Sequence, residues 1–168
     1  MRRLLASTGR RIRRIFWTGV VRRRAASVGA ALRVNGRSRV TPQTILGNNV
    51  NFNGLVIAGC GVVQIGNNFH SGEECVILSE IHDYNGDALP YDHNRIPRPV
   101  TIGDNVWLGR RVMVLGGVTI GDGAIIQAGS VVVSDIPRLS IAGGHPAKVF
   151  AWRDAEHYHA LDQARKCV

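Results

Sequence analysis

The stretch from residue 100 to residue 132 reads VTIGDNVWLGRRVMVLGGVTIGDGAIIQAGSVV, and a branched aliphatic residue recurs in it at a step of six. These positions are Ile102, Leu108, Val114, Ile120, Ile126 and Val132. A helix repeats every 3.6 residues and a strand every two, so neither element needs this step. One short strand and one bend in every six residues would close a three-sided coil of about eighteen residues. The repeat therefore predicts a parallel β-helix, whose stacked coils bury one continuous core.

The residues between the aliphatic positions suit the bends of such a coil. A glycine often follows the aliphatic residue, as at Gly103, Gly109 and Gly121. A second small or aliphatic residue comes four positions after the first, at Val106, Val112, Val118, Ala124 and Ser130. Gly, Asp and Asn tolerate tight bends, and GDN and GDG supply them here.

The step of six also runs upstream, with one change of phase. Its positions are Val34, Val40, Leu46, Phe52 and Ala58, and then, after an extra residue, Ile65, Ser71 and Ile77. Residues 80–99 read EIHDYNGDALPYDHNRIPRP, which is too polar and too rich in Gly and Pro to be core. We expect an excursion of about twenty residues between two coils, and loops of that length are usually functional or disordered.

The net charge of +9 is unevenly distributed over the 168 residues. Residues 1–39 hold 12 of the 21 basic residues, all Arg, and the first acidic residue is Glu73. From residue 40 onward, nine basic residues face twelve acidic ones, a balance of −3. The basicity belongs to one segment, so it does not argue that the body of the protein binds nucleic acid.

The basic segment reads MRRLLASTGRRIRRIFWTGVVRRRAASVG. Its apolar residues could share one face of an imperfect helix: Leu5, Ile12, Ile15, Phe16 and Val20. Its apolar runs are too short to span a membrane, and Arg interrupts any secretory signal, although the composition also resembles a mitochondrial transit peptide. Two interpretations stay open: a basic helix on an anionic membrane surface, or a helix that is solvated or packs against a partner. Removing residues 1–27 is expected to leave the repeats intact.

The chain thus divides into three parts. Residues 1–27 form the basic segment, 28–150 the β-helix with its loop at 80–99, and 151–168 a tail with a short helix from about residue 153 to 166. Cys60, Cys75 and Cys167 show neither CxxC nor zinc spacing. Reduced thiols in a cytosolic protein are therefore expected, and no metal site is predicted.

The motifs VTIGDNVWLG, GVTIGDGAIIQAGSVV, SDIP and GGHPAKV resemble the hexapeptide-repeat acyltransferases. The resemblance is closest to the maltose, galactoside and capsular-polysaccharide O-acetyltransferases and covers roughly residues 46–152. It implies an all-β, left-handed parallel β-helix that assembles as a homotrimer. It also implies transfer of an acetyl group from acetyl-CoA, without a metal, to a hydroxyl of a sugar or polysaccharide precursor.

In that family a histidine on the excursion loop acts as the general base, and the matching position is His82 in SEIHDYN. Histidine suits this role because its pKa lies near working pH. His93, on the same loop, is assigned a structural or acceptor-side role. A carboxylate is expected to orient the base, and the candidates are Glu80, Asp83, Asp87 and Asp92.

The acceptor contacts also follow from the resemblance. The motif NFN at residues 51–53 matches one whose first Asn binds the acceptor sugar, so Asn51 is assigned to the substrate. Asp83 and Asp92 are further acceptor-side candidates on the loop. An acidic pair of some sugar-binding relatives is replaced by Gly59 and Cys60, which leaves the identity of the sugar open.

The coenzyme is expected in a groove between two subunits. Trp107 matches the aromatic residue that flanks this groove, so we assign it to both substrate and coenzyme. The other coenzyme candidates are Gly109, Arg110, Ala128, Gly129, Ser130 and Lys148. Many relatives carry TKD before IP where this chain has Val133, Ser134 and Asp135. The missing Lys leaves the phosphates to Lys148, Arg153 or Arg110, and Lys148 is preferred because it occupies the family's basic position in PAKV.

Three other functions compete with this prediction. An N-acyltransferase on an amino sugar would use the same base and coenzyme. A β-helical carbonic anhydrase needs three zinc histidines; His70, His82 and His93 are available, but the usual closely spaced pair is missing. A catalytically silent structural trimer would not need His82, Asn51 and Trp107 together. For the O-acetyltransferase we expect a cytoplasmic location, at the inner face of a membrane through residues 1–27.

Overall fold

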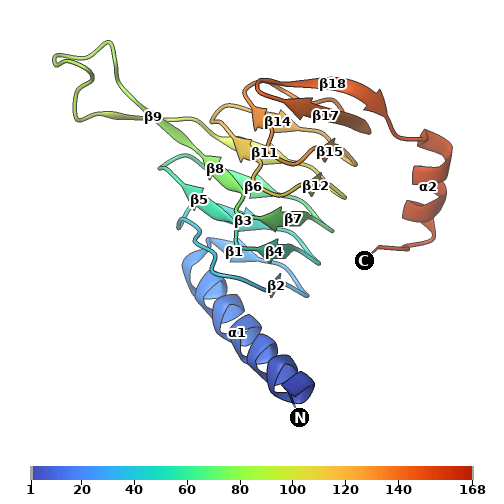
Figure 1. Ribbon diagram of the computed structural model, residues 1–168. Helices are drawn as coiled ribbons and strands as arrows, with labels where there is room; N and C mark the ends of the chain where they lie inside the picture. The colour runs from blue at the N-terminus through green and yellow to red at the C-terminus, as the bar shows by residue number, and fades with distance from the viewer. Residues whose placement is uncertain (1, 168) are drawn as a thin grey trace.

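The computed structural model describes residues 2–167, and most of them form a three-sided stack of short parallel strands (Figure 1). Face 1 consists of β1 (Ser27–Val28), β3 (Thr44–Leu46), β6 (Val63–Ile65), β11 (Val100–Ile102) and β14 (Thr119–Ile120). Face 2 consists of β2 (Arg33–Val34), β4 (Asn51–Asn53), β7 (His70–Glu73), β12 (Trp107–Leu108), β15 (Ile125–Ile126), β17 (Ser140–Gly144) and β18 (Ala147–Trp152). Face 3 consists of β5 (Val56–Ala58), β8 (Val76–Leu78), β13 (Met113–Val114) and β16 (Val131–Val132). The predicted left-handed parallel β-helix is confirmed.

The aliphatic residues at the step of six form the core of this prism. All six positions from Ile102 to Val132 are at most 1% exposed. The register pairs Ile102 with Ile120 and Leu108 with Ile126, so one coil takes eighteen residues. The second set of small and aliphatic residues, from Val106 to Ser130, is also buried. Burying each large aliphatic side chain stabilises the fold by about 1.5–3 kcal/mol.

The coils before the loop depart from the step of six at one expected core position. Ile57 is 1% exposed and pairs with Ile77, whereas Ala58 is only partly buried. The prediction of Ala58 as the core residue is therefore wrong, because the chain takes five residues rather than six from Phe52 to the next inward position. The expected inward positions Ile65, Ser71 and Ile77 are buried.

The excursion at residues 80–99 contains a two-stranded hairpin. Strands β9 (Glu80–His82) and β10 (Arg95–Pro97) pair antiparallel, with His82 opposite Arg95. Figure 1 shows this hairpin projecting from the prism, on the side away from α2. It leaves the prism directly after face 3, so His82 stands at the corner between faces 3 and 1.

Helix α1 (Arg2–Arg24) closes the first coil. Val21 is fully buried in the core, and the Val34 backbone N–H donates to Thr18 Oγ1 at 3.1 Å. The basic segment therefore includes the end cap of the prism, and we expect deletion of all 27 residues to expose the core at this end. Among the helices that the structure describes, none has the length and apolar character needed to cross a membrane.

The other end of the prism is closed by the β17–β18 hairpin, and helix α2 (Ala155–Gln163) follows this hairpin and lies beside the prism (Figure 1). Asp154 caps the helix by accepting a bond from the His157 backbone N–H at 3.0 Å. Tyr158 is 6% exposed, and its hydroxyl accepts a bond from Asn105 Nδ2 at 2.8 Å. These contacts hold α2 against the outer surface of face 2.

Candidate active site

A row of polar and aromatic side chains crosses face 2. The strand register pairs Asn51 with His70 and His70 with Trp107. Adjacent strands lie about 4.8 Å apart, so Asn51 and Trp107 are separated by roughly 10 Å although they are 56 positions apart in sequence. Trp107 is 51% exposed. We name this set, Asn51, His70 and Trp107, the face 2 row; it brings two of the predicted site residues together.

His70 is the member of the row that sequence reasoning did not assign to the site. It directly precedes core Ser71, as Asn51 precedes Phe52 and Trp107 precedes Leu108. The register of the repeat alone could have placed it between the other two. Its Nε2 lies 3.3 Å from Asn53 Nδ2, and partial burial lowers the pKa of His70 below its usual value. A neutral imidazole is therefore favoured there, and it can both donate and accept hydrogen bonds.

The asparagines of NFN are held in place by a neighbour on the preceding coil. Asn35 Nδ2 donates to Asn51 Oδ1 at 2.9 Å and to Asn53 Oδ1 at 3.0 Å. Asn53 Nδ2 in turn donates to the Ser71 carbonyl at 2.7 Å. This network fixes the side chains at one end of the face 2 row.

A groove of about 390 Å³ opens beside the row, between face 2 and α2. His70 and Trp107 line one side, while Tyr158, Asp162 and Lys166 line the other. The Arg153 guanidinium carbon lies 4.9 Å from the Tyr158 ring centre, and burial raises the pKa of the Tyr158 phenol. The groove thus combines an indole face with two cationic side chains and suits an extended ligand with anionic groups.

Among the residues that the structure describes, His82 contacts an aromatic neighbour, and no hydrogen bond joins it to a carboxylate. Its ring stacks on Tyr91 with 4.0 Å between ring centres and 24° between the planes. At the base of the hairpin, Glu80 pairs with Arg95 at 2.5 Å. The imidazole is exposed at the edge of the stack and can contact a molecule that approaches the hairpin.

Two of the three loop aspartates, Asp83 and Asp92, cap turns of the hairpin. Asp83 Oδ1 accepts a bond from the Asn85 backbone N–H at 3.0 Å. Asp92 accepts from the Asn94 backbone N–H at 2.7 Å and from its side-chain amide at 2.8 Å. In the described residues neither carboxylate contacts His82, and both shape the loop that carries it.

The predicted coenzyme residues lie along the corner between faces 2 and 3. Gly109 packs so closely on the next coil that a Cβ there would stand 2.5 Å from the Ala128 backbone nitrogen. The Gly129 N–H donates to the Arg110 carbonyl at 2.8 Å, and the buried Ser130 Oγ accepts a bond from the Gly144 N–H at 3.1 Å. Much of the polar backbone here is therefore already paired within the coils.

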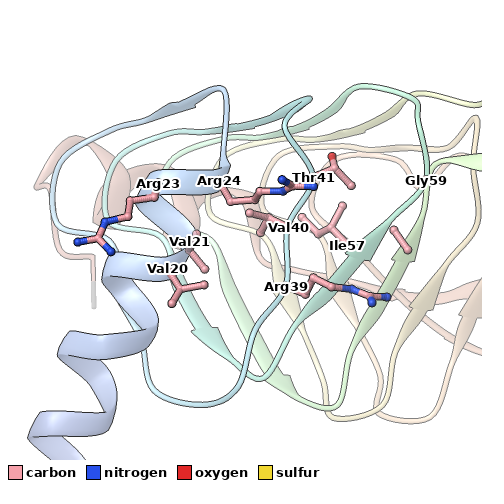
Figure 2. Close-up of a pocket in the computed structure, with 10 residues that line it drawn as sticks. Val20, Val21, Arg23, Arg24, Arg39, Val40, Thr41, Ile57 and Gly59 are labelled. Carbon is pink, nitrogen blue, oxygen red and sulfur yellow. The ribbon is translucent and has the colours of Figure 1, made fainter.

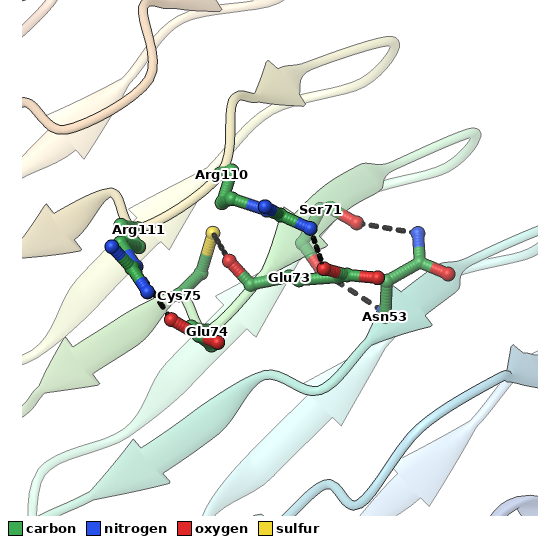
Figure 3. Close-up of polar contacts among 7 residues, drawn as sticks. All are labelled: Asn53, Ser71, Glu73, Glu74, Cys75, Arg110 and Arg111. Atoms are coloured by element: carbon green, nitrogen blue, oxygen red, sulfur yellow. Dashed lines mark hydrogen bonds and ion pairs between the residues drawn. The ribbon is translucent and has the colours of Figure 1, made fainter.

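Two charged side chains of this corner remain exposed. Arg110 forms an ion pair with Glu73 on the preceding coil, beside a second pair between Arg111 and Glu74 (Figure 3). Lys148 stands on β18, opposite Gly143, at the end of the same corner. Exposed ion pairs contribute at most about 1 kcal/mol, so Arg110 can exchange Glu73 for an anionic ligand at low cost.

One chain does not bring all the predicted residues together. The face 2 row and the coenzyme corner are neighbours, but the His82 hairpin leaves from the corner between faces 3 and 1 and extends away from α2 (Figure 1). Within residues 2–167, no group of three or more His, Cys, Asp or Glu side chains is placed to hold a metal ion.

The repeat itself is shared with known proteins. Residues 99–134 match the model of the bacterial transferase hexapeptide family, described as six repeats. This part of the chain carries the bacterial transferase hexapeptide repeat. The matched residues cover β11 to β16, where the step of six is unbroken.

A curated relative covers part of the chain. The Schizosaccharomyces pombe protein named "Putative acetyltransferase C18B11.09c" is 41% identical over 87 residues, which are 52% of this chain and 42% of that protein. This chain thus spans less than half the length of that relative.

Solved structures share most of the fold. A galactoside acetyltransferase in complex with coenzyme A is 28% identical, with a TM-score of 0.68 over 84% of this chain and 72% of that one. A hexapeptide-repeat acetyltransferase from Vibrio cholerae is 26% identical, with a TM-score of 0.71 over 82% of this chain and 80% of that one. Most of the fold is therefore shared with acetyltransferases, one of which is in complex with coenzyme A.

Proposed function

We propose that this protein is an acetyl-CoA-dependent O-acetyltransferase that acts on a hydroxyl of a sugar or polysaccharide precursor. The observation that carries the proposal is the arrangement of face 2, where Asn51, His70 and Trp107 line up beside a corner with exposed Arg110 and Lys148. The polar and aromatic row suits a saccharide, and the basic corner suits the phosphates of a coenzyme. The galactoside acetyltransferase that binds coenzyme A shares this fold and supports the assignment.

The chemistry needs only a base and a place for each substrate. His82 removes the proton of the acceptor hydroxyl, and the oxygen attacks the carbonyl carbon of the thioester. The carbon–sulfur bond then breaks, and the thiolate takes the proton from the imidazolium of His82. Direct transfer in a ternary complex requires no metal and no covalent enzyme intermediate. The Tyr91 stack holds the imidazole plane during both proton transfers.

The site is completed in a homotrimer. Because the hairpin of one chain extends away from the face 2 row of the same chain, we propose that it closes the row of a neighbouring copy. In this arrangement Trp107 flanks the coenzyme groove, Asn51 contacts the acceptor, and Asp83 and Asp92 contribute from the loop. Gly109, Ala128 and Gly129 line the coenzyme, while Arg110 and Lys148 contact its phosphates. The buried Ser130 supports this corner through its hydrogen bond with the Gly144 N–H. We place the enzyme in the cytoplasm, at the inner face of a membrane, with the basic segment 1–27 toward the lipid.

Co-expression of two inactive variants tests the shared site. His82→Ala chains supply a complete face 2 row, and Trp107→Ala chains supply a complete hairpin. Random assembly into trimers gives about a quarter of sites with both parts intact. Acetyl transfer from acetyl-CoA to a panel of sugars, measured by mass spectrometry, should recover to that level in the mixture and stay low in either variant alone. A mixture as inactive as its parts would contradict the shared site, and a panel of hydroxyl and amino acceptors separates O- from N-transfer.

A further inference from the structure

Helix α1 has two faces with different surroundings. Trp17, Thr18 and Val21 lie on the face that packs against the first coil. Ile12, Ile15 and Phe16 follow the i, i+3, i+4 spacing of one helical face, and at 100° per residue this face points away from Val21. Figure 1 shows the helix running outward from the end of the prism. The packing of the inner face therefore holds α1 in place, and the outer face, with Ile12, Ile15 and Phe16, contributes nothing to the core.

The outer face is apolar and bordered by arginine. Ile12, Ile15 and Phe16 are 63%, 63% and 60% exposed. Arg10, Arg11, Arg13 and Arg14 around them are exposed, and the first carboxylate in the chain is Glu73. The described ion pairs all involve other arginines. A basic helix with large apolar side chains and no acidic residue complements an anionic lipid surface.

The outer face leads into a groove at the root of the helix. Ile12, Phe16 and Val20 are spaced by four residues and form one line along α1. The line ends at a groove of about 690 Å³, whose floor includes Val20, Val21, Val40 and Ile57. Figure 2 shows the side chains of Arg24 and Arg39 extending to the same side, with Val40 and Ile57 between them. In the described part of the chain neither guanidinium is paired with a carboxylate.

We propose that this end of the prism is a docking surface for an anionic phospholipid bilayer, and that the groove takes one lipid. The apolar face of α1 lies at the boundary between headgroups and acyl chains, and its arginines contact headgroup phosphates. The acyl chain of the bound lipid packs on the partly exposed Val20 along the groove, and its phosphate lies between Arg24 and Arg39. A second copy of α1 is a poor occupant, because the two helices would repel each other by their like charge. The inference rests on the membrane location proposed above and names the lipid chemistry that it requires.

Vesicle binding tests the docking surface with the full-length protein. The protein should co-sediment with vesicles of phosphatidylcholine and phosphatidylglycerol, and not with phosphatidylcholine alone. Binding at about 0.1 M salt should be lost toward about 1 M, because the screening length falls from about 10 Å to about 3 Å. Ile15→Ser with Phe16→Ser should abolish binding and leave the sedimentation of the protein without vesicles unchanged. Failure of the full-length protein to bind would overturn both the membrane location and the lipid site, whereas a changed oligomer in the double variant would make the outer face a contact between copies.

A matched pair of charge variants isolates the groove. Arg24→Gln with Arg39→Gln should weaken vesicle binding about 30-fold. Arg138→Gln with Arg165→Gln removes the same charge from exposed positions outside α1 and the groove, and should bind as the wild type does. Equal binding by both double variants would refute the lipid site while leaving the membrane location in place. Acetyl transfer to a soluble sugar should be unchanged in both double variants. This assay tests the proposed reaction independently of lipid binding.

Discussion

The coils after the hairpin are regular, and the coils before it are not. From Ile102 to Val132 the inward residues keep a strict step of six, and the family model matches this half. Before the hairpin the step shortens to five between Phe52 and Ile57, and the register shifts between β4 and β7. The regular half carries most of the predicted coenzyme residues, at the corner between faces 2 and 3. The irregular half carries Asn51, His70 and the first coil, against which α1 packs. The comparison suggests that departures from the repeat adapt one prism to its own acceptor and its own location.

The largest effect on activity is expected from a substitution in the hairpin that separates the two halves. His82→Ala should lower kcat by about 10² to 10⁴, the usual contribution of a general base, with little change in acetyl-CoA binding. Steady-state kinetics with isothermal titration of the coenzyme measures both quantities. His93→Ala is the comparison on the same loop: with a structural or acceptor-side role, it should keep a kcat near that of the wild type and change at most the KM for the acceptor. Full turnover by His82→Ala would mean that His82 is not the general base.

The five-residue step of the irregular half can be tested by stability. Ile57→Ala should lower the free energy of unfolding by about 2–5 kcal/mol, because Ile57 is buried and the prism cannot collapse around the cavity. Ile45→Ala makes the same change at a side chain that is 37% exposed and should cost much less. Urea unfolding followed by circular dichroism measures both. Equal losses would mean that Ile57 does not face the core and that the step of six continues from Phe52 to Ala58.

The sequence predicted the regular half in detail and the irregular half in outline. Hydrophobic periodicity is a local signal, so it identified the inward residues from Ile102 to Val132 and the polar loop with His82. It misplaced the core position at Ala58, because a one-residue change of step leaves no mark in composition. It also left His70 unassigned and treated residues 1–27 as separable, because the contacts of His70 and Val21 depend on which coils lie side by side.

His70 tests whether the part of the face 2 row that lies in the irregular half binds the acceptor sugar. His70→Ala should raise the KM for the sugar roughly 5- to 10-fold, the value of one hydrogen bond, while the KM for acetyl-CoA stays unchanged. His157→Ala, in the exposed part of α2, is the control and should change neither. A rise in the KM for acetyl-CoA instead would mean that the coenzyme binds on face 2 rather than at the corner between faces 2 and 3. If both KM values are unchanged, His70 contacts neither the sugar nor the coenzyme.

The smallest expected effect is the pH dependence that His70 gives to stability. Partial burial lowers its pKa in the folded protein, while the unfolded chain keeps the ordinary value of about 6.5. As the pH falls below that value, the unfolded state binds the proton first, so the free energy of unfolding decreases until the folded pKa is also passed. Wild type should therefore lose stability relative to His70→Gln between neutral and mildly acidic pH in a series of urea unfolding curves. A relative gain over the same range would mean that His70 is protonated in the folded protein and faces a carboxylate of the assembled trimer.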